Sequence, residues 1–147
     1  MKRLLTILCM ICALSSCIYD SKNDNFYRTL WVSKEAPFGE VGQTSDGRIT
    51  LEFLCGGSIS VTATGAAGSY GKYQSYGNTA YFAGLTLTYY SDAATIISTY
   101  SEGEDNDSAK IVIEEAHRTD DLLLVSWHRD GSPISYTTRF IRRSSYE

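Results

Sequence analysis

The side chains best suited to acid–base or metal chemistry lie toward the C-terminal end of the chain. Glu114 and Glu115 are adjacent, and His117 and His128 follow closely. Two carboxylates that flank one bond can act as general acid and general base. Neighbouring residues of a β-strand, however, point to opposite faces of the sheet, so Glu114 and Glu115 cannot act on one bond together. The sequence therefore gives no paired-carboxylate site.

The turn between segments 109–118 and 122–129 decides which glutamate faces the interior of the fold. A turn of three residues pairs Val125 with Glu115, whereas a turn of four residues pairs Val125 with Glu114. We favour the shorter turn because it keeps the two isoleucines of the first segment on the buried face.

Four residues form the candidate ligand-binding site: Glu115, His117, Trp127 and Tyr136. With the shorter turn, Glu115 and His117 lie on the interior face near a rim. A polar pair at the mouth of an apolar cup is suited to orienting a ligand. The alternative is a solvated end of the fold with no ligand. His128 then faces residue 112, too far from His117 for the two rings to share a metal.

Other motifs argue against cofactors and catalysis. The acidic stretch 102–107 lacks the sixth Gly and twelfth Glu after Asp105 that an EF-hand needs, so we interpret it as a solvated turn. The sequence has no Cys/His spacing typical of a metal site, and no nucleophile elbow, phosphate loop or dinucleotide fingerprint. We expect no metal, no cofactor and no enzymatic activity.

The N-terminus carries a different kind of chemistry. Lys2 and Arg3 precede the apolar stretch Leu4–Leu14, which is too short to cross a hydrocarbon core of roughly 30 Å and has the length of a signal peptide's apolar region. The stretch ends in Leu14-Ser15-Ser16-Cys17. This ending resembles a bacterial lipoprotein signal, whose box has a Leu-small-small-Cys pattern. The resemblance implies cleavage before Cys17 and attachment of lipid to that cysteine.

The lipoprotein resemblance also implies a location: the cell envelope, at the outer membrane. Proteins of this class carry two or three acyl chains, palmitate among them, and two or more chains anchor a protein stably where one does not. Removing residues 1–16 leaves 131 residues (147 − 16) with 11 Lys+Arg (13 − 2) and 17 Asp+Glu, a net charge of −6. This balance argues against nucleic acid as a partner and against charge-driven docking on anionic lipid.

Signal removal also affects the cysteines. Cys9 and Cys12 leave with the signal and Cys17 is alkylated, so only Cys55 remains and we expect no intramolecular disulfide. Cys55 lies beside two glycines at an expected hairpin tip. A reactive thiol or an intermolecular bridge is one interpretation. No His or Arg lies nearby to activate the sulfur, so we favour a small, half-buried residue without a chemical role.

The mature chain divides into a tether and one domain. Residues 18–25 are mostly polar and lack periodicity, which is typical of a flexible linker. We therefore assign 1–16 to the signal peptide, 17–25 to the tether and 26–147 to a β-barrel domain. The domain has the β-branched and aromatic composition of strands and no helical periodicity. The expected strands are about 26–33, 48–54, 58–64, 70–76, 79–83, 85–90, 95–100, 109–118, 122–129 and 133–142.

The dipeptide Asp130-Gly131 predicts a hairpin, because it fits a two-residue type I′ turn. This turn pairs Trp127 with Ile134 and Val125 with Tyr136. The same register places five apolar residues on one buried face. They are Leu123, Val125, Trp127, Ile134 and Tyr136.

The alternation of apolar residues changes phase between Phe82 and Leu85, which predicts a bulge. Ala80 and Phe82 lie on even positions, whereas Leu85, Leu87 and the tyrosine at position 89 lie on odd ones. The alternation must therefore shift by one residue between them. A bulge or sharp bend at Gly84 would achieve this, and barrels use such features to turn corners.

The fold class that follows is all-β, an antiparallel barrel of about 8–10 short strands, because closing a sheet removes its edges. A β-sandwich is the alternative.

The chain resembles the small lipocalin-like barrels found as bacterial lipoproteins. The resemblance is carried by Thr29-Leu30-Trp31-Val32, Ile49–Phe53, Gly71-Lys72-Tyr73, Gly77–Phe82 and Gly84–Leu87. Lipocalins carry Gly-x-Trp on the first strand, where the Trp plugs the closed end; this chain keeps Trp31 and has Thr29 in place of the Gly. The resemblance implies an extracytoplasmic barrel.

Tyrosines gather in one part of the domain: Tyr70, Tyr73, Tyr76, Tyr81, Tyr89 and Tyr90. They indicate either a sugar- or protein-binding surface or simple strand propensity with ring pairing.

We expect a lipid-anchored cell-envelope binding module for a small apolar or amphipathic ligand. The alternative is a structural or interaction protein whose barrel is filled and which contacts another envelope protein. A lumen packed solid by large aromatic residues would favour the alternative. The residues in question are Trp31, Phe53, Phe82, Trp127 and Phe140.

Overall fold

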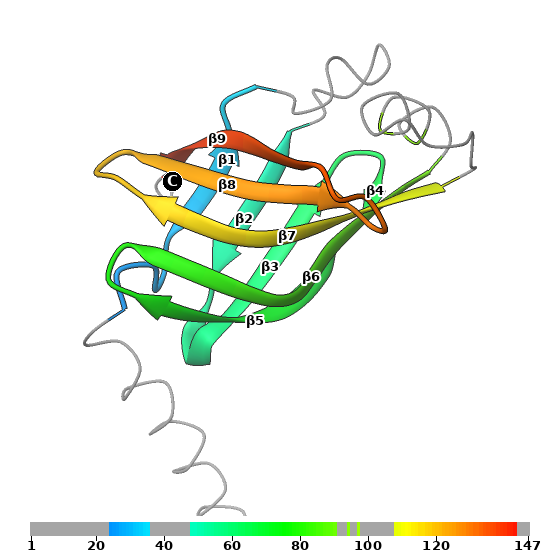
Figure 1. Ribbon diagram of the computed structural model, residues 1–147. Coiled ribbons are helices and arrows are strands. Elements are labelled where there is room, and N and C mark those ends of the chain that lie inside the picture. Colours follow the sequence, from blue (N-terminus) through cyan, green and yellow to red (C-terminus); the bar gives the residue numbers. More distant parts are fainter. Residues whose placement is uncertain (1–23, 36–47, 91–93, 95–96, 98–107, 144–147) are drawn as a thin grey trace, which may run out of the picture.

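A computed structural model describes residues 24–35, 48–90, 94, 97 and 108–143 of the chain. Eight antiparallel strands close into a barrel, because β1 pairs with β9 and β6 pairs with β7 (Figure 1). The short strand β4 pairs with β6 beside the barrel. The elements are β1 (Leu30–Ser33), β2 (Ile49–Phe53), the 3-10 turn η2 (Cys55–Gly57), β3 (Ser58–Ala63), β4 (Ala66–Ala67), β5 (Ser69–Tyr76), β6 (Thr79–Tyr90), β7 (Ser108–Arg118), β8 (Leu122–Arg129) and β9 (Ser135–Arg143). The all-β barrel prediction is confirmed, in a form consistent with a lipocalin-like fold.

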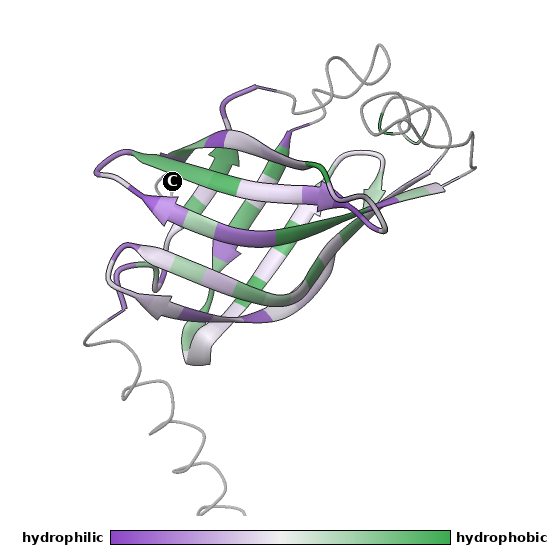
Figure 2. Cartoon of the chain, in the orientation of Figure 1, coloured by the Kyte–Doolittle hydropathy of each residue, from purple (hydrophilic) through white to green (hydrophobic). Residues whose placement is uncertain are grey.

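Alternation of apolar and polar residues builds the barrel wall. Bands of opposite hydropathy follow one another along the strands (Figure 2), and the apolar positions face inward. Trp31, Phe53 and Phe140 are each at most 1% exposed, and Trp127 is 3% exposed. Phe82 is partly buried and packs against the same core. A side chain without accessible surface borders no void that a water molecule could enter, so these residues fill the described interior.

The predicted bulge at Gly84 is confirmed. Tyr81 pairs with Glu115 and Leu85 with Ile113, so three residues of β6 lie opposite one residue of β7. Gly84 has φ +69°, a conformation that side chains other than glycine rarely adopt. The bulge therefore allows the residues before and after it to face the same core.

The hairpin of β8 and β9 has the predicted inner face but a different register. Trp127 pairs with Tyr136 rather than with Ile134, and Ile134 is 44% exposed, so that part of the prediction is wrong. The turn itself forms, with Ser132 N donating to Arg129 O over 2.9 Å. Only glycine has positive φ in this turn, which excludes type I′, and Pro133 has no N–H for the ladder. Pairing therefore begins two residues later.

A turn before β1 closes one end of the barrel. The predicted strand 26–33 begins only at Leu30, because Thr29 N donates to Phe26 O over 3.1 Å. Phe26 is fully buried, with its ring centroid 5.0 Å from that of Phe53 and 6.4 Å from that of Tyr73. Asn25, which we assigned to the tether, donates from Nδ2 to Gly77 O over 3.0 Å.

The residue that replaces the lipocalin glycine has a structural role. The Thr29 hydroxyl donates to Phe26 O over 2.5 Å and accepts a hydrogen bond from Trp31 Nε1 over 2.8 Å. Arg118 Cζ lies 5.6 Å from the centroid of the Trp31 ring, on the same end of the barrel. Thr29 therefore joins the closing turn to the buried tryptophan.

Two residues of the connection between β6 and β7 are described, and both are buried. Ala94 and Ile97 have no accessible surface and belong to the core. Ile97 has a helical backbone, so the strand predicted at 95–100 is wrong at this residue. The rest of that predicted strand, and the predicted acidic turn 102–107, lie outside the described residues.

Candidate functional site

The register of β7 and β8 changes along the hairpin. At Ile113, which pairs with Trp127, it is the register of the shorter turn that we expected. Beyond it, Ala116 pairs with Val125, a register that neither of the two expected turns gives. The register shifts between Ile113 and Glu115, so Val125 pairs with neither of the two glutamates and both predicted pairings of Val125 are wrong.

The register shift between Ile113 and Glu115 is a β-bulge in β7, and it places Glu115 and His117 on the outside of the barrel. The prediction that these two residues face the interior is therefore wrong. Both residues are exposed, whereas Ala116 between them is fully buried. An extra residue in a strand reverses the alternation beyond it. The unpredicted bulge at Glu114 therefore turned Ala116 inward and its two neighbours outward.

Trp127 and Tyr136 lie on the inner face, on the other side of the wall from Glu115 and His117. Their rings stack with centroids 4.7 Å apart, and Trp127 Nε1 donates to Thr138 Oγ1 over 2.9 Å. Trp127 is 3% exposed and part of the packed core. The four predicted residues therefore do not converge on one cavity.

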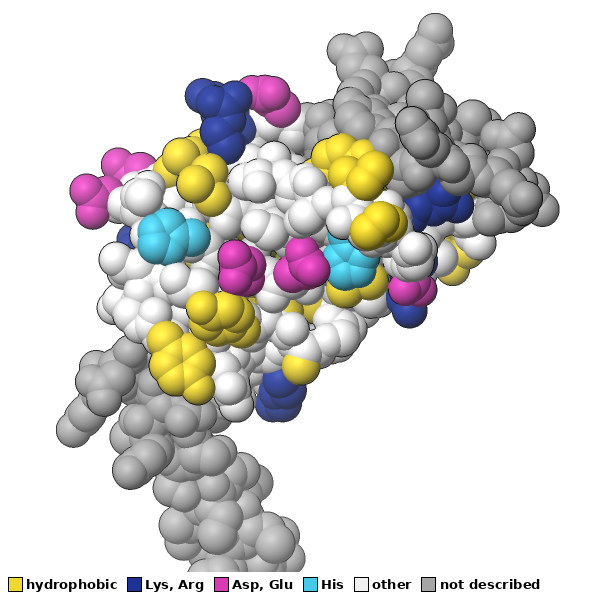
Figure 3. All heavy atoms as spheres, viewed as in Figure 1, with side chains coloured by type: hydrophobic (Ala, Val, Ile, Leu, Met, Phe, Trp, Pro, Cys, Tyr) yellow, Lys and Arg dark blue, Asp and Glu magenta, His cyan; other side chains and the backbone are white. Residues whose placement is uncertain are grey.

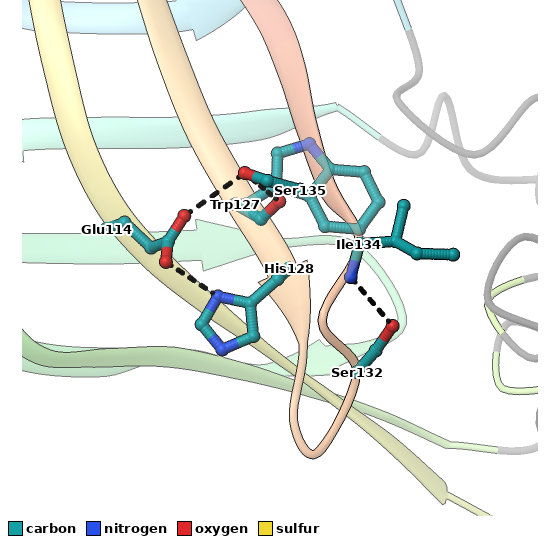
Figure 4. A network of polar contacts seen from close by, with 6 residues as sticks. All are labelled: Glu114, Trp127, His128, Ser132, Ile134 and Ser135. Atoms are coloured by element: carbon teal, nitrogen blue, oxygen red, sulfur yellow. Dashed lines mark hydrogen bonds and ion pairs between the residues drawn. The ribbon is translucent and has the colours of Figure 1, made fainter.

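A polar network that sequence reasoning missed lies on the outer face. Glu114 accepts a hydrogen bond from Ser135 Oγ at Oε2 over 3.2 Å, and its Oε1 lies 3.1 Å from His128 Nδ1 (Figure 4). The contact with the imidazole lacks the alignment of a hydrogen bond, so it is an ion pair only when the ring is protonated. The carboxylate stands between the hydroxyl and the imidazole. A serine nucleophile needs direct contact with its base, so this is not a hydrolase triad.

The outer face around this network is rich in exposed polar and aromatic groups. Figure 3 shows two acidic side chains between the two histidines on one face of the molecule. Thr79 Oγ1 lies 3.1 Å from His117 Nδ1. Tyr81 pairs with Glu115 across β6 and β7, and its ring centroid lies 6.0 Å from that of Tyr76. Among the described residues, no ion pair involves Glu115.

A groove opens at the barrel end that the Phe26 turn closes. Its volume is about 390 Å³. The Asp24 carboxylate is fixed there, because it accepts hydrogen bonds from Tyr73 Oη, from Ser75 Oγ over 3.2 Å and from Phe26 N over 2.9 Å. The Tyr76 hydroxyl reaches Gln74 Oε1 over 3.5 Å. We call this the rim groove; it is lined by Asp24, Gly56, Gly57, Tyr73, Gln74, Ser75 and Tyr76.

Cys55 is disulfide-bonded in the structure, and its partner lies outside the described residues. The expectation of no intramolecular disulfide was made for the chain after signal removal and stays a prediction. The other cysteines are Cys9, Cys12 and Cys17.

The described part of the chain holds no group of three His, Cys, Asp or Glu side chains placed to bind a metal ion. It also has no helix with the length and apolarity that a membrane span requires. Comparisons with protein-family models, with curated proteins and with solved structures found no match for this chain.

Proposed function

We propose that this protein is a lipid-anchored module of the cell envelope, at the outer membrane, that binds another envelope protein through the outer surface of a filled barrel. The packing of the interior carries the proposal. Trp31, Phe53 and Phe140 occupy the space that a lumenal ligand would need. The anchor rests on the Leu14-Ser15-Ser16-Cys17 pattern.

The outer face of β5, β6 and β7 supports the second part of the proposal. Tyr76 is 68% exposed and Tyr81 is 48% exposed, and their rings pack edge to face. Tyrosine is enriched in protein interfaces because it offers a large ring and a polar tip. Glu115 lies beside this pair and adds a charge that would select a basic partner surface.

Native mass spectrometry of the protein released from its own membrane tests the proposal. We expect a stoichiometric complex with a second protein. The complex should be lost in Tyr81→Ser and kept in Thr137→Ala, which changes an exposed residue of β9 instead. A monomer that carries neither a protein partner nor a dependence on Tyr81 would contradict the proposal.

The rim groove favours a second candidate, the binding of a small amphipathic ligand. Two phenol rings, an amide, a fixed carboxylate and two glycines line it, and such a mixture suits a ligand with both apolar and hydroxyl-bearing faces. In the same measurement, a retained small molecule that is lost in Tyr76→Ala would support this candidate. Tyr70→Ala is the matched control, because Tyr70 is 80% exposed and does not line the groove.

A further inference from the structure

The Asp24 carboxylate in the rim groove is held in place by neutral donors and has no positively charged partner. Its Oδ1 accepts hydrogen bonds from Phe26 N and Ser75 Oγ, and its Oδ2 accepts one from Tyr73 Oη. Among the described residues, no ion pair involves Asp24. An ionised carboxylate has about four acceptor positions, so these donors leave room for one more. The groove therefore presents a fixed negative charge that can still accept a hydrogen bond.

Two cations of the described chain lie near the groove, and both donate to backbone oxygens instead. Lys72 Nζ donates to Gly56 O over 3.3 Å, and Arg118 Nη1 donates to Asn25 O. Neither side chain lines the groove. The charge of Asp24 is therefore left for a group from outside the described chain.

An exposed aromatic ring borders the same groove. Tyr76 lines it, and the other side of this ring packs against Tyr81, with centroids 6.0 Å apart. The segment that carries Asp24 lies beside the end of β5, because Asn25 Nδ2 donates to Gly77 O (Figure 1). An aromatic ring attracts a cation to its face and also packs against an alkyl chain. The groove thus combines a negative charge with an apolar surface.

We propose that the rim groove binds a protonated amine, with its ammonium group at Asp24 and its carbon chain against Tyr76. The proposal rests on the second candidate function, the binding of a small amphipathic ligand in this groove, and names the chemical class of that ligand. An ammonium group has three donors and no acceptor, so it matches a carboxylate that can only accept. The volume of about 390 Å³ is in the range of ligand pockets and leaves room for the carbon chain.

Lys72 provides an internal check on the electrostatics. It is exposed on β5 and reaches the groove wall at Gly56 without lining the groove itself. Its positive charge repels a cation bound nearby and attracts an anion. Removing this charge should therefore strengthen the binding of an amine, whereas it would weaken the binding of an anion.

The experiment titrates the full-length protein in detergent with n-butylamine at neutral pH and low ionic strength. Calorimetry measures the binding against a blank of detergent alone, and the amine stays protonated at this pH. We expect saturable binding that Asp24→Asn weakens at least about tenfold, because a charge-assisted hydrogen bond is lost. Tyr76→Ala should weaken it about threefold through the lost cation–π contact. Lys72→Met should strengthen it about twofold.

Asp121→Asn is the matched control, because it removes a carboxylate charge from the exposed turn between β7 and β8, outside the groove. It should change the affinity less than twofold. Asparagine has nearly the size of aspartate and its amide oxygen can still accept from Phe26 N, so Asp24→Asn should keep the fold. Thermal unfolding checks each variant. If Asp24→Asn does not fold, the opposite signs expected for Tyr76→Ala and Lys72→Met still test the proposal.

Two further probes identify the source and the charge of the ligand. An acetylated glycine-lysine-glycine peptide presents the amine as a partner protein would, and 1-butanol has the carbon chain without the charge. Binding of either amine that depends on Asp24 supports the proposal, and the tighter of the two identifies the source. Equal binding of 1-butanol and butylamine that depends on Tyr76 would overturn the proposal but keep the groove as a site for an uncharged ligand. Equal effects of Asp24→Asn and Asp121→Asn would also overturn it, as would the absence of saturable binding of both amines.

Discussion

Replacing Phe140 with alanine tests whether the barrel interior is filled. Phe140 is 1% exposed on β9, between Leu123 of β8 and Ser33 of β1. Its ring makes no hydrogen bond, so the substitution removes apolar contacts alone. The Phe140→Ala variant should therefore report on packing without a polar contribution.

The expected loss follows from two contributions. Exposing a fully buried phenylalanine side chain costs about 1.5–3 kcal/mol. If about 80 Å³ of the vacated volume stays empty, the cavity adds about 2 kcal/mol at roughly 24 cal/mol per Å³. The free energy of unfolding should fall by about 4 kcal/mol, a large share of the roughly 5–15 kcal/mol that stabilises a typical domain.

Urea unfolding followed by the fluorescence of Trp31 and Trp127 measures this loss, since both indoles lie in the core. Thr137→Ala changes an exposed residue of the same strand and should stay within about 0.5 kcal/mol of the natural protein. The variant should also bind benzene or xenon in its new cavity, whereas the natural protein should not. A loss below about 1 kcal/mol, or stoichiometric binding of an apolar probe by the natural protein, would refute the filled interior.

Three further outcomes are expected. Thr29→Val should lower the free energy of unfolding by about 1–3 kcal/mol, because it leaves the buried Trp31 Nε1 without its hydrogen-bond acceptor; an unchanged melting temperature would contradict this. Burial raises the pKa of Tyr89, so the folded chain keeps a proton that the unfolded chain loses above about pH 10. Stability should fall as pH rises, and Tyr89→Phe should flatten that slope by up to about 1.4 kcal/mol per pH unit; equal slopes in denaturant titrations would exclude this role. Cys17→Ser should move the protein from the detergent phase to the aqueous phase, and continued membrane retention would argue against the lipid anchor.

The fold was predictable because its signals are local. Alternating residues define the wall, and a glycine marks the β6 bulge where the phase changes, since only Gly84 adopts φ +69° there without strain. The β8–β9 hairpin was predicted with the correct face and the wrong register. A shift of two residues preserves every side chain's face, so the hydrophobic pattern could not detect the effect of Pro133 on the ladder.

The candidate sites were much less predictable. The bulge in β7 falls at Glu114, a residue that carries no backbone signal, and it reverses the faces of Glu115 and His117. The rim groove depends on contacts such as the one between Tyr73 and Asp24, 49 residues apart in the sequence. Tyr73 lies in a predicted strand, whereas Asp24 was assigned to the tether. Only the closed barrel brings the two together.

The proposed lipid anchor at Cys17 would lie close in the sequence to the closed end of the barrel. Six residues, 18–23, separate Cys17 from Asp24, so a lipid on Cys17 would hold the rim groove within about 25 Å of the bilayer at full extension. Cys55 begins the turn that forms one wall of that groove. Processing would leave Cys55 as the single cysteine besides the alkylated one, so the lipid anchor and the Cys55 disulfide exclude each other within one chain. Intact mass tests this, because the proposed anchored form would lack residues 1–16 and would carry the mass of its acyl chains.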